Sequence, residues 1–229
     1  MCGRASLTVN EAELEERFDS DFYSEDLERY NPIPNYNIAP THFLPLLIDK
    51  HPDQFQIYRW GLIPFWSKDI KIASKMINTR VETILEKPYF KTAVQSRRCI
   101  VPLDGFYEWH KTESGEKHPL RIQVKSEKIF ATAGIYDSWR SPDGSLLNSF
   151  SILTCPSNEF MKPIHDRMPV ILSRQAEKWW LSPENTWNDI LGLMVPYESD
   201  DMKAYRVKEL VNQVKNNSAE LLEPYESNN

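Results

Sequence analysis

A succession of short runs rich in β-branched and aromatic residues limits most strongly how this chain can fold. Turn signals such as Ser141-Pro142-Asp143-Gly144 separate the runs. The runs are Phe43–Ile48, Gln54–Leu62, Cys99–Trp109, Leu120–Lys125, Ile129–Tyr136, Ser149–Thr154 and Pro169–Leu172. Because most of these predicted strands follow one another without a helix between them, they indicate mixed or antiparallel sheets in an α+β fold, rather than a wound parallel sheet.

Helical patterns fill some of the remaining intervals. Thr8 and Glu11 have the spacing of a capping box, which predicts a first helix that ends near Asp19 and buries Leu14 and Phe18. Further helices are expected at Lys87–Ser96, Ser157–Lys162, Arg174–Trp180 and Tyr205–Val214. The segment Tyr36–Thr41 is predicted to be a loop.

Composition excludes several classes of protein. The 229 residues lack an apolar run long enough for a membrane span or a signal peptide. Three cysteines at unrelated positions indicate reduced thiols in a cytoplasmic protein, and five histidines without ligand spacing predict no metal site. No glycine-rich phosphate loop occurs, so we expect no nucleotide cofactor.

Charge is distributed unevenly along the chain, whose formal net charge is −6. Residues 1–30 contain three basic and nine acidic side chains, whereas residues 59–98 contain nine basic and three acidic ones. A protein with this polarity can bind a polyanion on one face despite its acidic total. The alternative is that the lysines only keep that surface solvated.

The N-terminus, Met1-Cys2-Gly3-Arg4, points to a specific chemistry. Removal of Met1 would leave Cys2 with an α-amine and a thiol, whose reference pKa values are about 7.7–8.0 and 8.5. Such a pair condenses with an aldehyde, because the amine forms an imine and the thiol then closes a five-membered thiazolidine. Alternatively, in an N-terminal nucleophile hydrolase the thiol attacks an amide and the amine serves as base. The simplest alternative is a cysteine that only happens to follow the start codon.

Two aromatic and polar segments suit nucleic-acid binding. Trp60 is expected in the core, whereas Trp66, beside basic residues, is the better candidate for stacking on bases. In the run Asn78-Thr79-Arg80-Val81-Glu82, strand alternation would place Asn78, Arg80 and Glu82 on one side. A short solvated strand explains this run equally well.

Two titratable groups are candidates for proton transfer. Glu108 lies in an apolar strand between Tyr107 and Trp109, where a carboxylate either pairs with a cation or has a raised pKa. His165 lies on a loop held between two prolines and is suited to proton shuttling near pH 7. A structural histidine and a glutamate on the exposed face of a sheet are the alternatives.

Taken together and in this order, several segments resemble the SOS-response-associated peptidase (SRAP) family, whose members process abasic sites. The matching segments are Met1–Arg4, Tyr36–Thr41, Trp60–Pro64, Ile77–Thr83, Arg98–Pro102, Gly105–Trp109 and His165–Val170. The resemblance implies a single domain over residues 1–229, with a core at 2–224, a C-terminal tail at 225–229, and an incomplete β-barrel-like core with flanking helices. It also implies a monomer that removes its own Met1, captures abasic sites in single-stranded DNA and associates with the nucleoid when engaged on DNA, with possible lyase activity.

The resemblance assigns roles to individual residues. Cys2 would be the crosslinking nucleophile, Glu108 the general acid and base that opens the abasic sugar, His165 a second proton-transfer group and Asn78 the amide that holds the linkage. The DNA contacts would be Arg4, Asn37, Pro40, Trp66, Arg80 and Arg167, with Pro40 and Trp66 as a wedge beside the lesion. Some members of the family have two adjacent tryptophans at the wedge, whereas Phe65-Trp66-Ser67 supplies one.

Three other classes of protein remain as alternatives. A glutamine amidotransferase-like amidohydrolase also starts Met-Cys-Gly, but it continues with an apolar residue where this chain has Arg4, and glycine is scarce here. A thiol peptidase could use Cys2, His165 and Glu108, although nothing suggests a peptide-binding groove. A non-covalent DNA-binding module would use the same aromatic and basic residues, and a Cys2→Ala substitution would leave its DNA binding unchanged.

Overall fold

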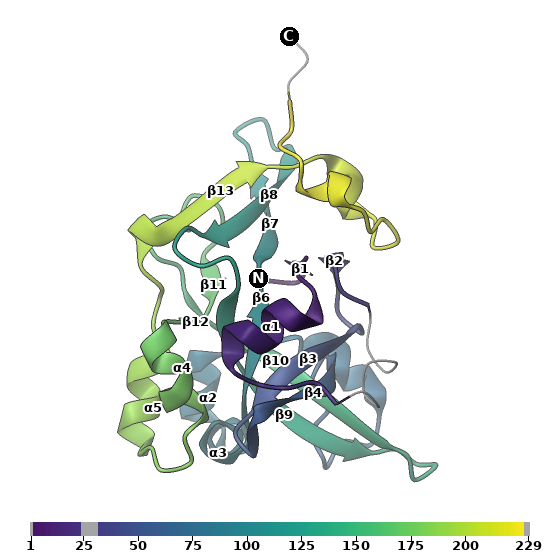
Figure 1. Cartoon of the computed structure of the whole chain (residues 1–229), viewed down its shortest axis with the longest axis vertical. Coiled ribbons are helices and arrows are strands. Elements are labelled where there is room, and N and C mark those ends of the chain that lie inside the picture. The colour runs from purple at the N-terminus through teal and green to yellow at the C-terminus, as the bar shows by residue number, and fades with distance from the viewer. Residues whose placement is uncertain (1, 24–31, 227–229) are drawn as a thin grey trace.

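The computed structural model describes residues 2–23 and 32–226, and its strands form two sheets (Figure 1). The strands of the smaller sheet are β1 (Ala5–Leu7), β2 (Asn35–Ile38), β7 (Gly105–Lys111), β8 (Lys117–Val124) and β13 (Met202–Arg206). They pair antiparallel in the order β13-β8-β7-β1-β2. The strand that follows the N-terminus, β1, therefore lies inside this sheet rather than at an edge.

The larger sheet contains a barrel. Its strands are β3 (Phe43–Ile48), β4 (His51–Trp60), β5 (Asn78–Arg80), β6 (Arg98–Leu103), β9 (Phe130–Arg140), β10 (Leu146–Pro156), β11 (Arg167–Pro169) and β12 (Ile171–Leu172). The pairings run β10-β4-β3-β6-β9 and return to β10, which closes a ring. The seam between β4 and β10 consists only of Ser149 opposite Arg59 and Phe150 opposite Trp60. The predicted α+β class with a barrel-like core is confirmed.

Helices gather at one end of the molecule, away from the C-terminal segment (Figure 1). They are α2 (Val81–Glu86), α3 (Pro88–Ser96), α4 (Arg174–Leu181) and α5 (Trp187–Leu193), while α1 (Glu11–Phe18) crosses the middle of the view. Short 3-10 helices occupy Ile70–Lys75, Ser199–Asp201, Glu209–Asn212 and Ala219–Leu222. The expected helices at 87–96 and 174–180 are confirmed.

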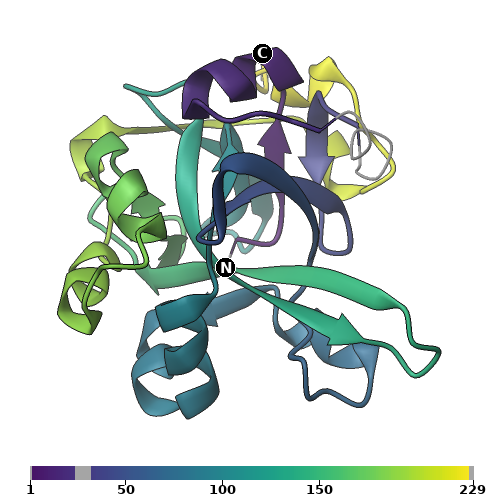
Figure 2. The ribbon, with the colours of Figure 1, turned by 60° about the horizontal axis from the view of Figure 1, so that its bottom comes forward.

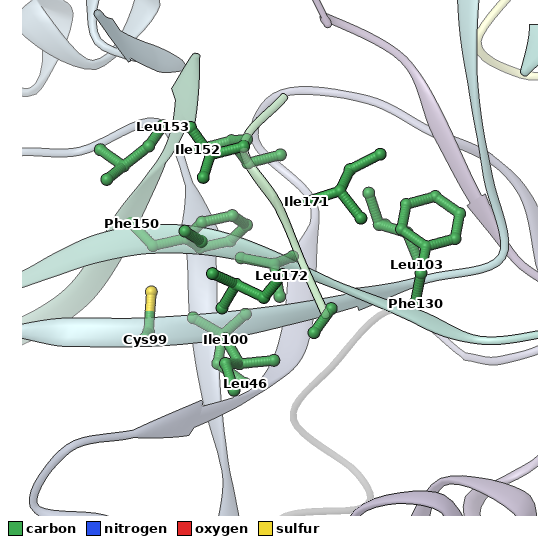
Figure 3. Packing of buried hydrophobic residues seen from close by; sticks show 14 of the residues in the cluster. Leu46, Cys99, Ile100, Leu103, Phe130, Phe150, Ile152, Leu153, Ile171 and Leu172 are labelled. Carbon is green, nitrogen blue, oxygen red and sulfur yellow. The ribbon is translucent and has the colours of Figure 1, made fainter. Parts of the chain in front are cut away.

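The barrel interior is filled by aliphatic and aromatic side chains from facing strands. Figure 3 shows Leu46 of β3, Ile100 of β6 and Phe150 of β10 converging, with Leu172 of β12 beside them, and each is at most 4% exposed. Burying a side chain of this size contributes about 1.5–3 kcal/mol to folding. Trp60, expected in the core, is 1% exposed.

A buried arginine joins the helical layer to the barrel. The guanidinium of Arg98, at the start of β6, donates to the carbonyls of Val94 and Gln95 at 2.8 Å each and to that of Ser182 at 2.7 Å, and its Nε donates to the carbonyl of Trp180. These four carbonyls lie at the C-terminal ends of α3 and α4, where backbone oxygens lack helical partners and the helix dipole favours a cation. One side chain therefore caps two helices.

The first helix begins later than its sequence predicted. Asn10, not Thr8, is the N-cap, and its side chain forms the capping box with Glu13. Thr8 is engaged elsewhere, because its backbone N–H and its hydroxyl both donate to the carboxylate of Asp104. Leu14 is fully buried as expected, and Phe18 is partly buried.

The predicted strand at 99–109 is in fact two strands, β6 and β7, which belong to different sheets. The chain changes sheet at Asp104, whose carboxylate accepts from Ser6 Oγ at 2.6 Å and pairs with Arg121 at 3.0 Å. At Gly105 a Cβ would come within 2.8 Å of the Arg121 guanidinium, so the residue after Asp104 must be small. Apolar periodicity alone could not show this break, because both strands are buried.

Three local predictions were also wrong. Residues 157–162 form turns rather than a helix, with the Asn158 side chain accepting from the Met161 N–H before Pro163. The segment 205–214 completes β13 and then forms a 3-10 helix, and the segment 36–41, predicted to be a loop, begins in strand β2. In the last two segments pairing with a distant strand decided the local structure, since β13 pairs with β8 and β2 pairs with β1.

Candidate active site

Cys2 lies three residues before β1, where it is completely buried. Its carbonyl oxygen accepts a hydrogen bond of 2.7 Å from Asn78 Nδ2, which joins the N-terminal segment to β5. In Figure 2 the segment leading into β1 begins near the centre of the view, above the helices α2 and α3. Two residues predicted to act together thus meet, although 75 residues separate them in sequence. Met1 lies outside the described residues.

Burial raises the pKa of the Cys2 thiol far above its ordinary value, and the negative charge of Glu108 raises it further. In the chain that carries Met1 the thiol therefore stays protonated near neutral pH, and the partly ionised thiol expected after removal of Met1 stays a prediction. A neutral thiol becomes a nucleophile only if a neighbouring group takes its proton as it reacts. The Tyr107 N–H donates to the Arg4 carbonyl at 2.9 Å, so the strand that carries Glu108 runs beside the segment that carries Cys2.

Glu108 occupies the middle of β7 and is 4% exposed. Two residues further along this strand, His110 Nδ1 lies 3.0 Å from the carbonyl oxygen of Pro163. This contact brings the loop of His165 to the end of β7. The structure therefore gathers Cys2, Asn78 and Glu108, and it fastens the His165 loop to the strand that carries Glu108.

The hydrogen bonds of His165 indicate its tautomer. The backbone N–H of Arg167 donates to His165 Nδ1 at 3.0 Å, which leaves the proton of a neutral ring on Nε2. The carboxylate of Asp166 lies 2.7 Å from the same nitrogen, but its side chain is 83% exposed. The backbone donor is fixed while the exposed carboxylate can turn away, so a neutral ring would carry its proton on Nε2.

The run from Asn78 to Glu82 differs from its prediction. Asn78 and Arg80 lie on β5, which pairs with β10, but the strand ends there and Glu82 belongs to α2. Glu82 instead forms a bidentate pair with Arg167, at 2.6 and 2.9 Å. Arg80 is exposed beside Asn78, as a phosphate contact requires.

Arg167 is held inside the protein. It is 8% exposed, and besides pairing with Glu82 it donates to the carbonyl oxygen of Thr154 at 2.6 Å. In this arrangement the guanidinium links α2, β10 and β11 and does not face solvent. A phosphate contact by Arg167 remains a prediction, and it would require the pair with Glu82 to open.

The pair between Glu82 and Arg167 should make stability depend on pH. Hydrogen bonds from Arg167 hold the pKa of Glu82 below its ordinary value. The ionised carboxylate therefore stabilises the fold above the unfolded-state pKa of about 4.3, and this contribution is lost as pH falls through the lowered folded-state pKa. We expect Glu82→Gln to lower the free energy of unfolding by about 1 kcal/mol at pH 7, because Glu82 is 47% exposed and water screens the pair.

Urea denaturation at pH 7 and at pH 3 measures this effect, with Glu86→Gln as the control on an exposed glutamate of the same helix. The difference between wild type and Glu82→Gln should shrink at pH 3. An equal difference at both pH values would show that the charge of Glu82 does not contribute.

Arg4 and Asn37 hold the C-terminal segment. Arg4 donates to Asn37 Oδ1 at 2.7 Å and to the carbonyl of Val211 at 2.6 Å, and Asn37 Nδ2 donates to the carbonyls of Gln213 and Asn216 at 3.0 and 2.8 Å. Asn37 is 1% exposed, so a contact with DNA, which stays a prediction, would require these hydrogen bonds to open. Sequence reasoning missed this anchoring role, because its partners are backbone carbonyls.

A cleft of about 480 Å³ opens beside Asn78. Its walls include three residues predicted from the sequence, namely Trp66, Asn78 and Arg80, and they also include aromatic and basic residues that were not predicted individually, namely Lys75, Lys87, Tyr89 and Phe90. Trp66 is 54% exposed. We call this region, defined by these residues, the aromatic cleft. Pro40, in the turn before β3, does not line it.

A second cavity of about 570 Å³ lies between α1 and α4 and contains none of the predicted site residues. Its volume is larger than that of the aromatic cleft and would alone favour it as the active site, but its floor of Leu47, Ile100 and Leu181 offers no reactive group. In residues 2–23 and 32–226 no helix is long and apolar enough to cross a membrane. The same residues contain no group of three histidine, cysteine or acidic side chains that could hold a metal ion.

Comparisons with known proteins give matches over most of the chain. A family model described as SOS response associated peptidase (SRAP) matches residues 1–214. The chain is 48% identical over 225 residues to the abasic site processing protein YoaM of Bacillus subtilis (strain 168), covering 97% of this chain and 98% of that protein. It is 32% identical to the abasic site processing protein HMCES of Mus musculus, covering 83% of this chain and 65% of that protein. A crystal structure from Bacteroides thetaiotaomicron superposes with a TM-score of 0.86 at 30% identity, over 93% of this chain and 95% of that one.

Proposed function

The chain belongs to the SOS response associated peptidase family, and we propose that it captures abasic sites in single-stranded DNA as a covalent crosslink through Cys2. The observation that carries the proposal is the hydrogen bond from Asn78 Nδ2 to the Cys2 carbonyl, 2.7 Å long, at the edge of the aromatic cleft. It sets the N-terminal residue beside a surface suited to a DNA strand. The relatives named as abasic site processing proteins support the choice of substrate.

The chemistry begins with removal of Met1, which frees the α-amine of Cys2. An abasic sugar is mostly a closed hemiacetal, and a proton-transfer group must take the proton of its hydroxyl and protonate the ring oxygen to expose the aldehyde at C1′. The amine adds to C1′ and water leaves, which gives an imine. The thiol sulfur then bonds to C1′ while its proton passes to the imine nitrogen, and the product is a thiazolidine. One water is released overall.

We assign these proton transfers to Glu108 first and to His165 second. A thiol whose pKa is raised by burial and by the charge of Glu108 stays protonated until it reacts, so it needs a base in contact with it. Glu108 is the carboxylate near it. His165, as the neutral Nε2–H tautomer, has a proton to donate on the opposite nitrogen from its backbone hydrogen bond.

DNA would reach this site along the aromatic cleft. Arg80, Lys75 and Lys87 supply cations for phosphates, and Trp66 supplies a stacking surface, a combination typical of sites for single-stranded nucleic acid. Arg4 and Pro40 are further candidates for contacts at the lesion. Because an abasic site has no base to read, we expect little sequence preference. We also expect the protein to bind DNA as a monomer.

Two finer activities follow from the same chemistry. Hydrolysis of the Met1–Cys2 bond by the chain itself would account for the word peptidase in the family name. An imine at C1′ also acidifies the neighbouring C2′ protons, so β-elimination would cut the strand if the imine persisted. Closure of the thiazolidine removes the imine, and we therefore propose that capture protects the strand and that lyase activity is a side reaction.

The test uses a single-stranded oligonucleotide with one abasic site. Wild-type protein should give an adduct that survives a denaturing gel, and intact mass should show that Met1 is absent. Double-stranded DNA with the same lesion should react more slowly. If protein that lacks Met1 forms no adduct, the proposal fails, and hydrolysis of glutamine or of peptides by the same preparation would then favour an amidohydrolase or a thiol peptidase.

A further inference from the structure

We propose that His110 is a positioning residue for the crosslinking reaction, because its hydrogen bond to Pro163 sets where the His165 side chain lies relative to Glu108. The inference rests on the proposed function, in which Glu108 and His165 transfer protons. The role requires no contact between His110 and the lesion. His110 acts through residues 157–166, which we call the histidine loop.

The hydrogen bond joins the two segments at matching places. His110 follows Glu108 by two residues on β7, and Pro163 precedes His165 by two residues in the histidine loop. Alternate residues of a strand point to the same face and lie about 7 Å apart, so Glu108 and His110 face the same side. The bonded pair therefore connects the two proton-transfer residues by a short path, although they are distant in sequence.

The direction of this hydrogen bond defines what His110 must supply. A carbonyl oxygen only accepts, so His110 Nδ1 carries the proton that it donates to Pro163, at 3.0 Å. Both the neutral Nδ1–H tautomer and the imidazolium can donate in this way. The ring of Pro163 restricts its own backbone angle φ, so His110 holds the loop at a stiff residue.

The histidine loop keeps its shape through its own hydrogen bonds. The Met161 carbonyl accepts from the N–H groups of Ile164 and His165, at 2.8 Å each. The Asp166 carbonyl accepts from the Ser157 N–H at 3.1 Å, which closes the loop. These bonds are internal, so they leave the loop able to turn as a unit. Contacts between the loop and the rest of the protein therefore decide where His165 lies.

These outer contacts hold the loop at its base and at Pro163. Near the first residue of the loop, Asn158 Nδ2 donates to a backbone carbonyl between α5 and β13, at 2.6 Å. Just after the last residue, Arg167 forms the ion pair with helix α2 described above. Both contacts lie where the loop begins and ends, whereas His110 holds it at Pro163. The bond from His110 therefore opposes rotation of the loop about its base.

Single-turnover kinetics test this role. Protein in excess over an oligonucleotide with one abasic site gives a maximal rate of adduct formation and a half-saturating protein concentration. His110→Phe keeps a planar ring but removes the donor. We expect a maximal rate about 5- to 20-fold lower, a fraction of the roughly 10²–10⁴-fold that a general acid–base group contributes. The half-saturating concentration should change less than about twofold, because DNA binding does not involve this bond.

A conservative variant separates the hydrogen bond from the shape of the side chain. Asparagine can place its Nδ2 donor where His110 Nδ1 lies, so His110→Asn should restore most of the rate. His118→Phe is the matched control, because His118 lies opposite His110 on β8 and its ring is 3.4 Å from the Glu116 carboxylate. It should leave the rate unchanged. A rate as low in His110→Asn as in His110→Phe would overturn the inference.

A double-mutant comparison shows whether His110 acts through His165. In a His165→Ala background, His110→Phe should have no further effect, because the residue that it positions is absent. An equal loss in both backgrounds would overturn the inference, since a general loss of structure lowers the rate in either one.

Hydrogen exchange gives a readout that needs no DNA. The amides of Ile164 and His165 should exchange faster in His110→Phe and return to the wild-type rate in His110→Asn. Unchanged exchange in His110→Phe would also overturn the inference. If wild-type protein forms no adduct, or if His165→Ala reacts as fast as wild type, the proposed function fails instead.

Discussion

Cys2→Ala protein is expected to form no heat-stable adduct with single-stranded DNA that contains an abasic site, a loss of more than 100-fold relative to wild type. The substitution removes the sulfur that closes the thiazolidine but keeps an N-terminal amine once Met1 is removed. The amine can still form an imine, which hydrolyses on denaturation. Borohydride reduction should therefore trap the variant on the oligonucleotide, and denaturing gels with and without reductant make the measurement.

The variant should also cut more DNA than wild type does. An imine that cannot be closed by a thiol persists longer, so β-elimination has time to break the strand at the lesion. Cys155→Ala is the matched control, because it removes another buried thiol, one whose pKa burial raises to about 12, from β10. A heat-stable adduct from Cys2→Ala, or its loss in Cys155→Ala, would contradict the role assigned to Cys2.

Arg98→Met is expected to destabilise the fold by about 3–5 kcal/mol, the largest effect on stability that we expect from a single substitution. Methionine has a similar length but offers no donors to the four carbonyls that Arg98 satisfies. Leaving a buried carbonyl unsatisfied costs about 1–3 kcal/mol, and some of the four will gain water as the helix ends relax. Urea denaturation followed by circular dichroism measures the loss.

Arg98→Lys separates charge from hydrogen bonding. Lysine keeps the cation at the ends of α3 and α4 but cannot match the planar fork of guanidinium donors. It should recover only part of the lost stability. Arg97→Met is the control, since Arg97 is the adjacent residue and lies nearer the surface, with its side chain 19% exposed. If Arg98→Met cost less than 1 kcal/mol, the two helices would not depend on this cap.

The sequence predicted those parts of the site whose chemistry is visible in a single residue and its neighbours. Cys2 was identified from its position after Met1, Glu108 from its apolar strand, and Trp66 from the basic residues beside it. The structure brings Cys2 and Asn78 into contact and lines one cleft with Asn78, Arg80 and Trp66. The roles of these residues in catalysis and DNA binding remain predictions.

The sequence could not predict features that depend on distant partners. Asn37 was assigned to DNA because its segment resembles a family motif, yet its amide binds backbone carbonyls more than 170 residues away. Asp104 was read as the middle of one strand, because two buried strands joined end to end have the same apolar pattern as one long strand. Glu82 was predicted to lie in a strand but lies in helix α2, because β5 ends at Arg80, where its pairing with β10 ends. In each case the deciding contact is long-range and leaves no local pattern.

The anchoring of Arg4 by the C-terminal segment has a consequence for how the protein is made. Arg4 hydrogen bonds to Val211 and to Asn37, which in turn binds residues up to Asn216. At about 5–20 residues per second, synthesis of the 207 residues from Arg4 to Val211 takes on the order of tens of seconds, and during that time Arg4 lacks the Val211 carbonyl. Arg4 consequently reaches its final position only after Val211 has been synthesised, whereas Asn78, the partner of the Cys2 carbonyl, is synthesised much earlier.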